Sequence, residues 1–192
     1  MNVNSYIELY MKETQKIADL INKNDISKIV DILSEIKKSG GRLFILGVGG
    51  SAANASHAVN DFRKIVGIET YTPTDNVAEL TARTNDDGWN TSFSKWLEIS
   101  KLNPKDALMV FSVGGSSLTT SPNIREAIDY AKERKAKITG IVSRDGGYVK
   151  QKANACILVP VISNERITPH AEGWQGILWH LIVNALISCT DM

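Results

Sequence analysis

Apolar residues in the first part of the chain recur at the spacing of an amphipathic helix. Between Tyr6 and Lys38 most of them lie three or four positions apart, and the polar stretch Asn22 to Asp25 interrupts the pattern. This arrangement predicts an N-terminal helical segment over about residues 1–38, divided into two helices.

The next segment has the pattern of a strand, a glycine-rich loop and a helix. Arg42 to Leu46 is a short apolar run, Gly47 to Ser51 is rich in glycine, and residues 52–62 are rich in alanine and free of glycine and proline. A buried strand followed by a tight turn and a helix fits this order.

The same order occurs again later in the chain. Ala107 to Ser112 predicts a second buried strand, Val113 to Ser117 a second glycine-containing loop, and Pro122 to about Arg134 a helix with proline in its first turn. Two strand–loop–helix units of this kind favour a parallel sheet.

The last third of the chain continues the alternation of strands and helices. We expect strands at Lys137–Val142 and Ala155–Pro160, a turn at Ser143–Tyr148, and a closing helix from about Ala171 to Ser188. The fold class is therefore α/β, a three-layer sandwich with helices on both faces of a parallel sheet. Ligands are expected at the carboxyl ends of the strands.

Composition and charge narrow the classes of partner. The chain has 192 residues, with 22 Lys and Arg against 21 Asp and Glu, which suits one globular domain over residues 1–192. A net charge of +1 gives no bulk attraction for nucleic acid or an anionic membrane, so neither is expected as a partner.

The sequence also favours a reducing compartment. Cys156 and Cys189 form no CxxC pair or disulfide framework, and we expect both to be free thiols. The N-terminus lacks the pattern of a signal peptide, and no apolar run reaches the roughly 18 residues of a membrane span. These features predict a cytoplasmic location.

The first glycine-rich loop is a candidate anion site. Gly49 and Gly50 would let the backbone turn sharply, and Ser51 places a hydroxyl at a helix start whose free N–H groups favour anions. The loop lacks the Lys-Ser/Thr pair of a Walker A motif and the spacing of a dinucleotide-binding GxGxxG. A phosphate or sugar site and a simple tight turn both remain open.

The second loop concentrates hydroxyl groups at the end of a strand. Ser112, Ser116 and Ser117 are followed by further Ser and Thr residues just before a helix. Such neutral donors suit a phosphate, although solvated loop hydroxyls would give the same pattern.

Histidines and carboxylates recur at helical spacing in two places. His57 and Asp61 are four apart and would share a helix face. Glu172 and His180 are eight apart, which is about 80° around a helix and about 12 Å along it, and His170 precedes them. For the second pair the residues alone favour a core helix with a buried histidine over a ligand site. For the first pair a surface hydrogen bond explains the spacing equally well.

The segment Gly-x-Gly-Gly-Ser-Ala-Ala-x-Ala-x-His at residues 47–57 resembles the signature of phosphoheptose isomerases, a branch of the SIS (sugar isomerase) family. Leu80–Asp86 resembles the family segment that ends in Asn-Asp, Ser143–Gly147 its Gly-Lys-Asp-Gly-Gly turn, and Glu172–His180 its closing segment. The resemblance covers nearly the whole chain.

The resemblance implies a flavodoxin-like SIS domain and a homotetramer with active sites at subunit interfaces. It also implies one zinc ion per subunit, held by His57, Asp61, Glu172 and His180. His170 is a replacement ligand if Glu172 points away.

Several positions depart from the family pattern. Asp61 stands for the usual Glu, Glu172 for the usual Gln, and Val48 for an Asn. The phosphate loop reads Ser112-Val-Gly-Gly-Ser-Ser117, and with Thr168-Pro-His-Ala-Glu172 it is similar to a variant subgroup. The extra carboxylate should favour a divalent ion.

The activity implied is isomerisation of sedoheptulose 7-phosphate to D-glycero-D-manno-heptose 7-phosphate through an enediol, a step toward lipopolysaccharide or capsule precursors. Asp61 or Glu172 would be the base and His180 the acid. The implied substrate contacts are Gly49, Gly50, Ser51, Asn85, Asp86, Ser112, Ser116, Ser117 and Glu172. A non-catalytic SIS regulator that associates with a replication initiator, or an isomerase of another sugar phosphate, is the alternative.

Overall fold

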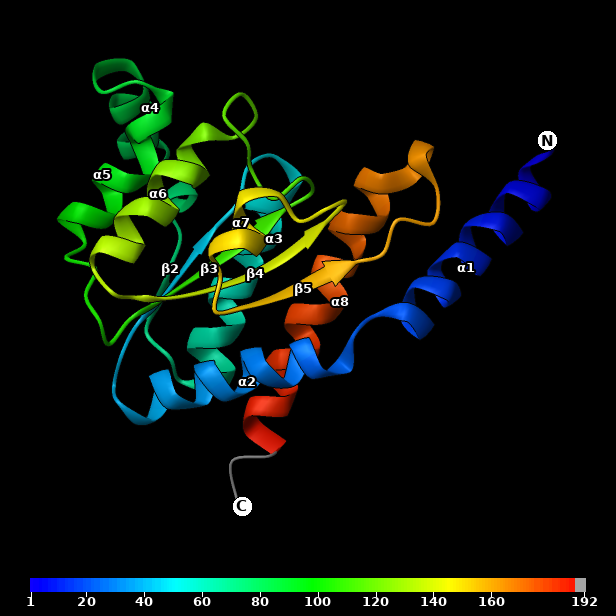
Figure 1. Ribbon diagram of the computed structural model, residues 1–192, viewed down its shortest axis with the longest axis horizontal. Coiled ribbons are helices and arrows are strands. Elements are labelled where there is room, and N and C mark those ends of the chain that lie inside the picture. Colours follow the sequence, from blue (N-terminus) through cyan, green and yellow to red (C-terminus); the bar gives the residue numbers. More distant parts are fainter. Residues whose placement is uncertain (189–192) are drawn as a thin grey trace.

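A central parallel sheet with helices on both faces forms the body of the molecule. The computed structural model describes residues 1–188, so Cys189 lies outside the described residues. Helix α1 extends away from the body and carries the N-terminus, as Figure 1 shows. No helix in the described part of the chain is long and apolar enough to cross a membrane.

The strands are β1 (Leu43–Leu46), β2 (Thr70–Tyr71), β3 (Ala107–Ser112), β4 (Lys137–Ser143) and β5 (Ala155–Val159). The longer helices are α1 (Val3–Leu20), α2 (Lys23–Lys38), α3 (Gly50–Asp61), α4 (Val77–Asp86), α5 (Ser92–Ile99), α6 (Pro122–Glu133), α7 (Gly147–Lys152) and α8 (Ile167–Ser188). A π-helical turn Phe62–Val66 continues α3, and short 3₁₀ turns lie at Pro73–Asp75, Trp89–Thr91 and Asn164–Arg166.

The sheet has the order β2-β1-β3-β4-β5, and all of its neighbouring strands are parallel. This is the flavodoxin-like order, in which the connections leave in opposite directions from β1 and β3. The loops after β1 and β3 therefore border a crevice at the carboxyl edge of the sheet, where ligands bind in folds of this class.

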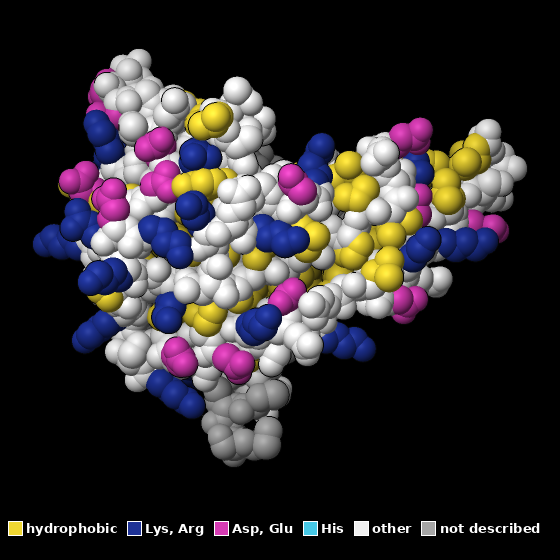
Figure 2. All heavy atoms as spheres, viewed as in Figure 1, with side chains coloured by type: hydrophobic (Ala, Val, Ile, Leu, Met, Phe, Trp, Pro, Cys, Tyr) yellow, Lys and Arg dark blue, Asp and Glu magenta, His cyan; other side chains and the backbone are white. Residues whose placement is uncertain are grey.

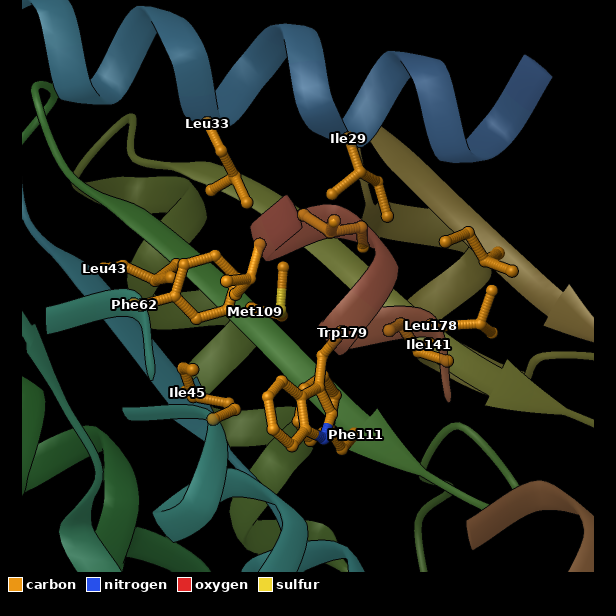
Figure 3. Packing of buried hydrophobic residues seen from close by; sticks show 14 of the residues in the cluster. Ile29, Leu33, Leu43, Ile45, Phe62, Met109, Phe111, Ile141, Leu178 and Trp179 are labelled. Carbon is orange, nitrogen blue, oxygen red and sulfur yellow. The ribbon is translucent and has the colours of Figure 1, made fainter. Parts of the chain in front are cut away.

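Side chains of the longer strands alternate between two cores. Leu43 and Ile45 of β1 join the core under α2, α3 and α8, whereas Phe44 and Leu46 join the core under α5, α6 and α7. Figure 3 shows the first core, where Trp179 of α8 packs beside the strands. The two faces of the sheet are both buried, which explains why the strands read as continuous apolar runs.

An asparagine side chain caps the N-terminus of each of the first two helices, and the second, Asn22, marks the boundary between them. The side chain of Asn2 accepts a hydrogen bond from the Ser5 N–H, and that of Asn22 accepts one from the Asn24 N–H. The predicted division of residues 1–38 into two helices is therefore confirmed.

Some boundaries differ from the sequence prediction. Helix α8 begins at Ile167 rather than Ala171, because Pro169 fits in a first helical turn, where no N–H partner is needed. The expected turn at 143–148 already contains the start of α7. Strand β2 has only two residues, too few to give an alternating pattern.

A buried ionic cluster attaches α1 to the start of α8. Glu13 accepts two hydrogen bonds from the Arg166 guanidinium, both 2.9 Å long, and lies 2.8 Å from His170 Nε2. The His170 ring stacks on Tyr10. The hydrogen bonds from Arg166, with a contribution from His170, lower the pKa of Glu13 from 4.5 to about 2.

Replacing Glu13 by glutamine should destabilise the protein at neutral pH, because Arg166 and His170 lose a charged partner. Arg166 then keeps its ion pair with the exposed Glu165. The pKa of Glu13 is lower in the folded chain than in the unfolded one, so its contribution is present above pH 4.5 and disappears as the pH falls toward about 2. Urea unfolding from neutral to acid pH measures this. Glu8→Gln, at an exposed position of the same helix, is the control. Equal urea midpoints for wild type and Glu13→Gln at neutral pH would contradict the assignment.

Candidate functional site

The loop after β1 brings the chain sharply into α3. Gly49 has a φ of 64°, in the region that favours glycine, and it precedes the first residue of the helix. No side chain caps the N-terminus of α3. Its first-turn N–H groups and the positive end of the helix dipole therefore face the carboxyl edge of the sheet.

Helices α3 and α8 lie side by side and run in the same direction. Gly50 lies against Glu172, and the Asn54 side chain donates to the Glu172 carbonyl at 2.9 Å and to Gln175 Oε1 at 3.1 Å. Further along, the ring of His57 contacts that of Trp179. This alignment brings the polar residues of both helices together.

His57, Asp61 and His180 converge at the far end of this contact. Each offers one ligand atom, and these atoms lie within 4.8 Å of one another. His180 Nδ1 is 3.6 Å from Asp61 Oδ2. Asn60 donates a 2.8 Å hydrogen bond to the other oxygen of Asp61. Two imidazoles and one carboxylate are ligand types that suit zinc, and three protein ligands are usual for a catalytic zinc site.

Trp179 packs its indole ring against the rings of both His57 and His180. Its indole is almost fully buried in the core beside the sheet, and its ring centroid lies 4.7 Å from that of His57. The His57 and His180 rings are 5.4 Å apart. Trp179 thus restricts the orientation of both imidazoles.

Glu172 lies outside this group of three. Its carboxylate sits against Gly50 at the N-terminus of α3, where a Cβ on Gly50 would come within 2.6 Å of Glu172 Cδ. The structure therefore brings together three of the four residues expected to bind metal. Glu172 remains a predicted catalytic and substrate-binding residue, placed where a helix N-terminus favours a carboxylate.

Two adjoining cavities lie at the switch point of the sheet. The larger, of about 360 Å³, is lined by Ser112, Val113, Gly114, Ser116, Ser117, Thr120, Arg144 and Thr168. The smaller, of about 130 Å³, is lined by Val48, Ser51, Phe111, Ser112, Val113, Gly114, Thr120 and Ser121. Because the linings share residues, both cavities open along the second loop, and the smaller one reaches the start of α3.

The serine hydroxyls of the second loop have different hydrogen-bonding roles. Ser112 Oγ accepts from the Gly115 N–H at 3.1 Å, and Ser117 Oγ accepts from the Thr120 N–H at 3.0 Å. Ser112 retains a hydroxyl hydrogen to donate, and Ser117 does so when Thr119, whose Oγ1 is 3.5 Å away, is the donor in their contact. Ser116 Oγ instead donates to the Ser121 carbonyl at 2.9 Å, which shapes the loop.

Other residues expected at the site lie elsewhere in this chain. Asn85 and Asp86 are exposed at the end of α4, where the Asn85 side chain donates to Asp86. They line neither cavity. His170, considered as a replacement ligand, is buried against Glu13 and Tyr10. It belongs to the ionic cluster with α1.

Sequence reasoning assigned no role to Arg144 or to Thr168, which border the larger cavity. Arg144 directly follows β4, the neighbour of β3 in the sheet. Because ligands bind at the carboxyl ends of parallel strands, this position could have indicated Arg144 as a binding residue. Thr168 begins the segment Thr168–Glu172 that resembles a variant subgroup, but the resemblance assigned that threonine no contact.

Comparison with known proteins places this arrangement in a family. Residues 6–143 match the SIS domain. The chain belongs to the SIS domain family. It is 33% identical over 171 residues to phosphoheptose isomerase 1 of Campylobacter jejuni, with 84% of this chain and 88% of that protein covered.

Solved structures agree on the fold. A phosphoheptose isomerase from Neisseria gonorrhoeae has a TM-score of 0.82 at 23% identity, with 97% of each chain covered. The NanR protein of Vibrio vulnificus, solved in complex with ManNAc-6P, has a TM-score of 0.68 at 13% identity and covers 94% of this chain, which spans 60% of that one. The predicted flavodoxin-like α/β fold is confirmed.

Proposed function

We propose that this protein is a sugar-phosphate isomerase that converts sedoheptulose 7-phosphate into D-glycero-D-manno-heptose 7-phosphate through an enediol. The observation that carries the proposal is the shared alignment of α3 and α8. The group of His57, Asp61 and His180 lies at one end of this helix pair. The Glu172 carboxylate and Ser51, which lines the smaller cavity, lie at the other end. The similarity to phosphoheptose isomerases over most of the chain supports this substrate.

The spacing along α3 suits a phosphorylated sugar of several carbons. Ser51 lines the smaller cavity and His57 belongs to the convergent group, and six residues of helix span about 9 Å. A phosphate held by Ser112 and Ser117 would leave the carbonyl end of the sugar extending toward the histidines. Ser51, Gly49 and Gly50 would contact the chain between these two ends.

Glu172 is the better placed of the two candidate bases. The Asp61 carboxylate already faces Asn60 and His180, whereas the Glu172 carboxylate lies against Gly50 at the N-terminus of α3, one residue before the cavity-lining Ser51. Glu172 would remove the proton from the carbon beside the carbonyl. His180 Nδ1 faces Asp61, and its second ring nitrogen can carry the proton needed on oxygen.

His57, Asp61 and His180 would hold the zinc ion, one per subunit. The donor set fits this metal, and three protein ligands leave a position for substrate oxygens. The ion would supply a Lewis acid that polarises the carbonyl and hydroxyl oxygens. Glu172 would then act on the substrate from outside the ligand set.

A panel of sugar phosphates tests the substrate assignment. We expect conversion of sedoheptulose 7-phosphate, and loss of that conversion after treatment with a chelator. Preference for an amino-sugar phosphate would indicate another isomerase. Sugar-phosphate binding without conversion would favour a regulator, because NanR shows that this fold also occurs in a protein solved with a bound sugar phosphate.

We further propose a homotetramer, supported by exposed apolar side chains on α1 and α8. Ile7 and Met11, one turn apart on α1, are 53% and 55% exposed, and Ile177 and Leu181 of α8 are also exposed. Figure 2 shows hydrophobic side chains gathered over the extension formed by α1. Exposed apolar surface of this kind is usually buried against a partner. Because Asn85 and Asp86 are exposed and line neither cavity of their own chain, we propose that they contact the substrate of a neighbouring subunit.

Light scattering of the wild type should give about four times the monomer mass of 21.1 kDa. The double variant Ile7→Asp/Met11→Asp should form smaller species, because burying two carboxylates in an apolar contact is costly. The control Ile99→Asp, at a 70% exposed position on α5, should remain tetrameric. A monomeric wild type at micromolar concentration would rule out the tetramer.

A further inference from the structure

We propose that Arg144 binds the phosphate group of the substrate and thereby determines the preference for phosphorylated sugars. The inference rests on the proposed function, and it adds a charged contact to a phosphate site otherwise formed by hydroxyl groups. Arg144 belongs to the turn after β4, a segment given no role in the chemistry described above.

The side chain of Arg144 runs along the phosphate loop. Its Cδ lies 3.8 Å from the position that a Cβ on Gly114 would occupy, so the aliphatic part of Arg144 passes close to the loop backbone. The residue lines the same 360 Å³ cavity as Ser112 and Ser117. The guanidinium and the two available hydroxyls therefore border one space.

The charge balance of this cavity favours a dianion. Its lining contains one cationic side chain, Arg144, and no acidic one, within the residues that the structure describes. Arg144 also forms no ion pair with any residue in the range 1–188, although Arg42, Arg83 and Arg166 each do. A guanidinium offers several N–H donors in a planar fork that matches phosphate oxygens, and such charge-assisted bonds are stronger than those from hydroxyls.

The backbone at Arg144 is unusual for a residue with a large side chain. Its φ is 57°, in the left-handed region that glycine occupies most easily. The turn is held by a hydrogen bond from the Gly147 N–H to Asp145 Oδ1 at 3.1 Å. Non-glycine residues in this conformation concentrate at functional sites, and here the conformation accompanies a side chain that borders the cavity.

The test compares Arg144→Gln, Arg144→Lys and Arg144→Gly with the wild type. Lys135→Gln is the matched control. Lys135 is also exposed and also has a positive φ, of 60°, but it lies just before the N-terminal end of β4, whereas Arg144 follows the C-terminal end. The readouts are KM and kcat for sedoheptulose 7-phosphate and, independently, the affinity for inorganic phosphate measured by calorimetry.

We expect Arg144→Gln to raise both KM and the Kd for inorganic phosphate about 10- to 100-fold, with kcat changed much less. Arg144→Lys should restore part of the affinity, and Lys135→Gln should leave both values unchanged. Arg144→Gly should lose affinity to the same extent while its Tm stays equal or rises, which separates phosphate binding from damage to the turn.

Unchanged KM and phosphate affinity in Arg144→Gln would overturn the inference while leaving the isomerase proposal intact. A wild type that converts no sugar phosphate but binds inorganic phosphate through Arg144 would overturn the isomerase proposal and support the phosphate site. A wild type that neither converts sugar phosphates nor binds phosphate would overturn both.

Discussion

The variant His180→Ala is expected to lose the proposed divalent metal and to lower kcat/KM by about 10²- to 10⁴-fold. His180 contributes one of the three ligand atoms that lie within 4.8 Å of one another, and it is also the proposed acid. Two remaining ligands hold an ion poorly, because a zinc site uses at least three protein ligands. Elemental analysis and steady-state kinetics on the same preparation measure both effects.

His170→Ala is a matched control for this prediction. The residue type and the helix are the same, but His170 contacts Glu13 and Tyr10 instead of the convergent group. This variant should keep the metal and most of the activity while unfolding at a lower temperature. The three-residue metal site would be wrong if the wild type carried no stoichiometric divalent metal after gentle purification. It would also be wrong if His57→Ala and His180→Ala both kept the metal in full.

The variant Gly50→Ala is expected to lower kcat/KM by about 10²-fold with little loss of stability. A Cβ at this position would overlap the Glu172 carboxylate, with Cδ only 2.6 Å away. The obstacle is the end of a flexible side chain, so the carboxylate can move aside at small cost. That movement takes the proposed base away from the substrate.

Gly173→Ala is the control, since a Cβ there meets nothing within 4 Å although the residue is next to Glu172 on α8. It should keep full activity. The partner variant Glu172→Gln should lose at least as much activity as Gly50→Ala. If Gly50→Ala is impaired and Glu172→Gln is fully active, Gly50 acts through the helix N-terminus and Glu172 is not the base.

Much of the fold follows from the sequence because the strands β1, β3 and β4 have both faces buried along most of their length. Leu43 to Leu46 point alternately into two cores, so the whole run is apolar and stands out beside its glycine-rich loop. The region between α3 and β3 gave no such signal. The strand in this region, β2, pairs only two residues with β1. Helix α4 has no buried residue, so neither β2 nor α4 gives a marked hydrophobic pattern.

The site could be predicted in part. His57 and Asp61 share a helix face because of their spacing, and the structure places both beside His180. Glu172 lies two helical turns before His180, so on a continuous helix it reaches the start of α3 rather than the same ligand group. Which residues of α8 meet His57 and Asp61 is determined by how α3 and α8 are aligned. That alignment depends on tertiary packing, which the spacing of residues along one helix does not reveal.

The position of Arg144 at the cavity also depends on tertiary structure that the sequence does not reveal. The turn that contains it was evident from the two glycines that follow, but the direction of its side chain depends on how β4 pairs with β3. Strand order therefore had to be known before the residue could be connected with the phosphate loop.

Incubation of the metal-replete wild type with sedoheptulose 7-phosphate in D₂O, followed by NMR, tests the central claim most directly. The enediol route predicts D-glycero-D-manno-heptose 7-phosphate with deuterium on the carbon beside the carbonyl, because the base exchanges its proton with solvent. Absence of heptose 7-phosphate at any concentration of added zinc would contradict the assignment of this protein as a phosphoheptose isomerase.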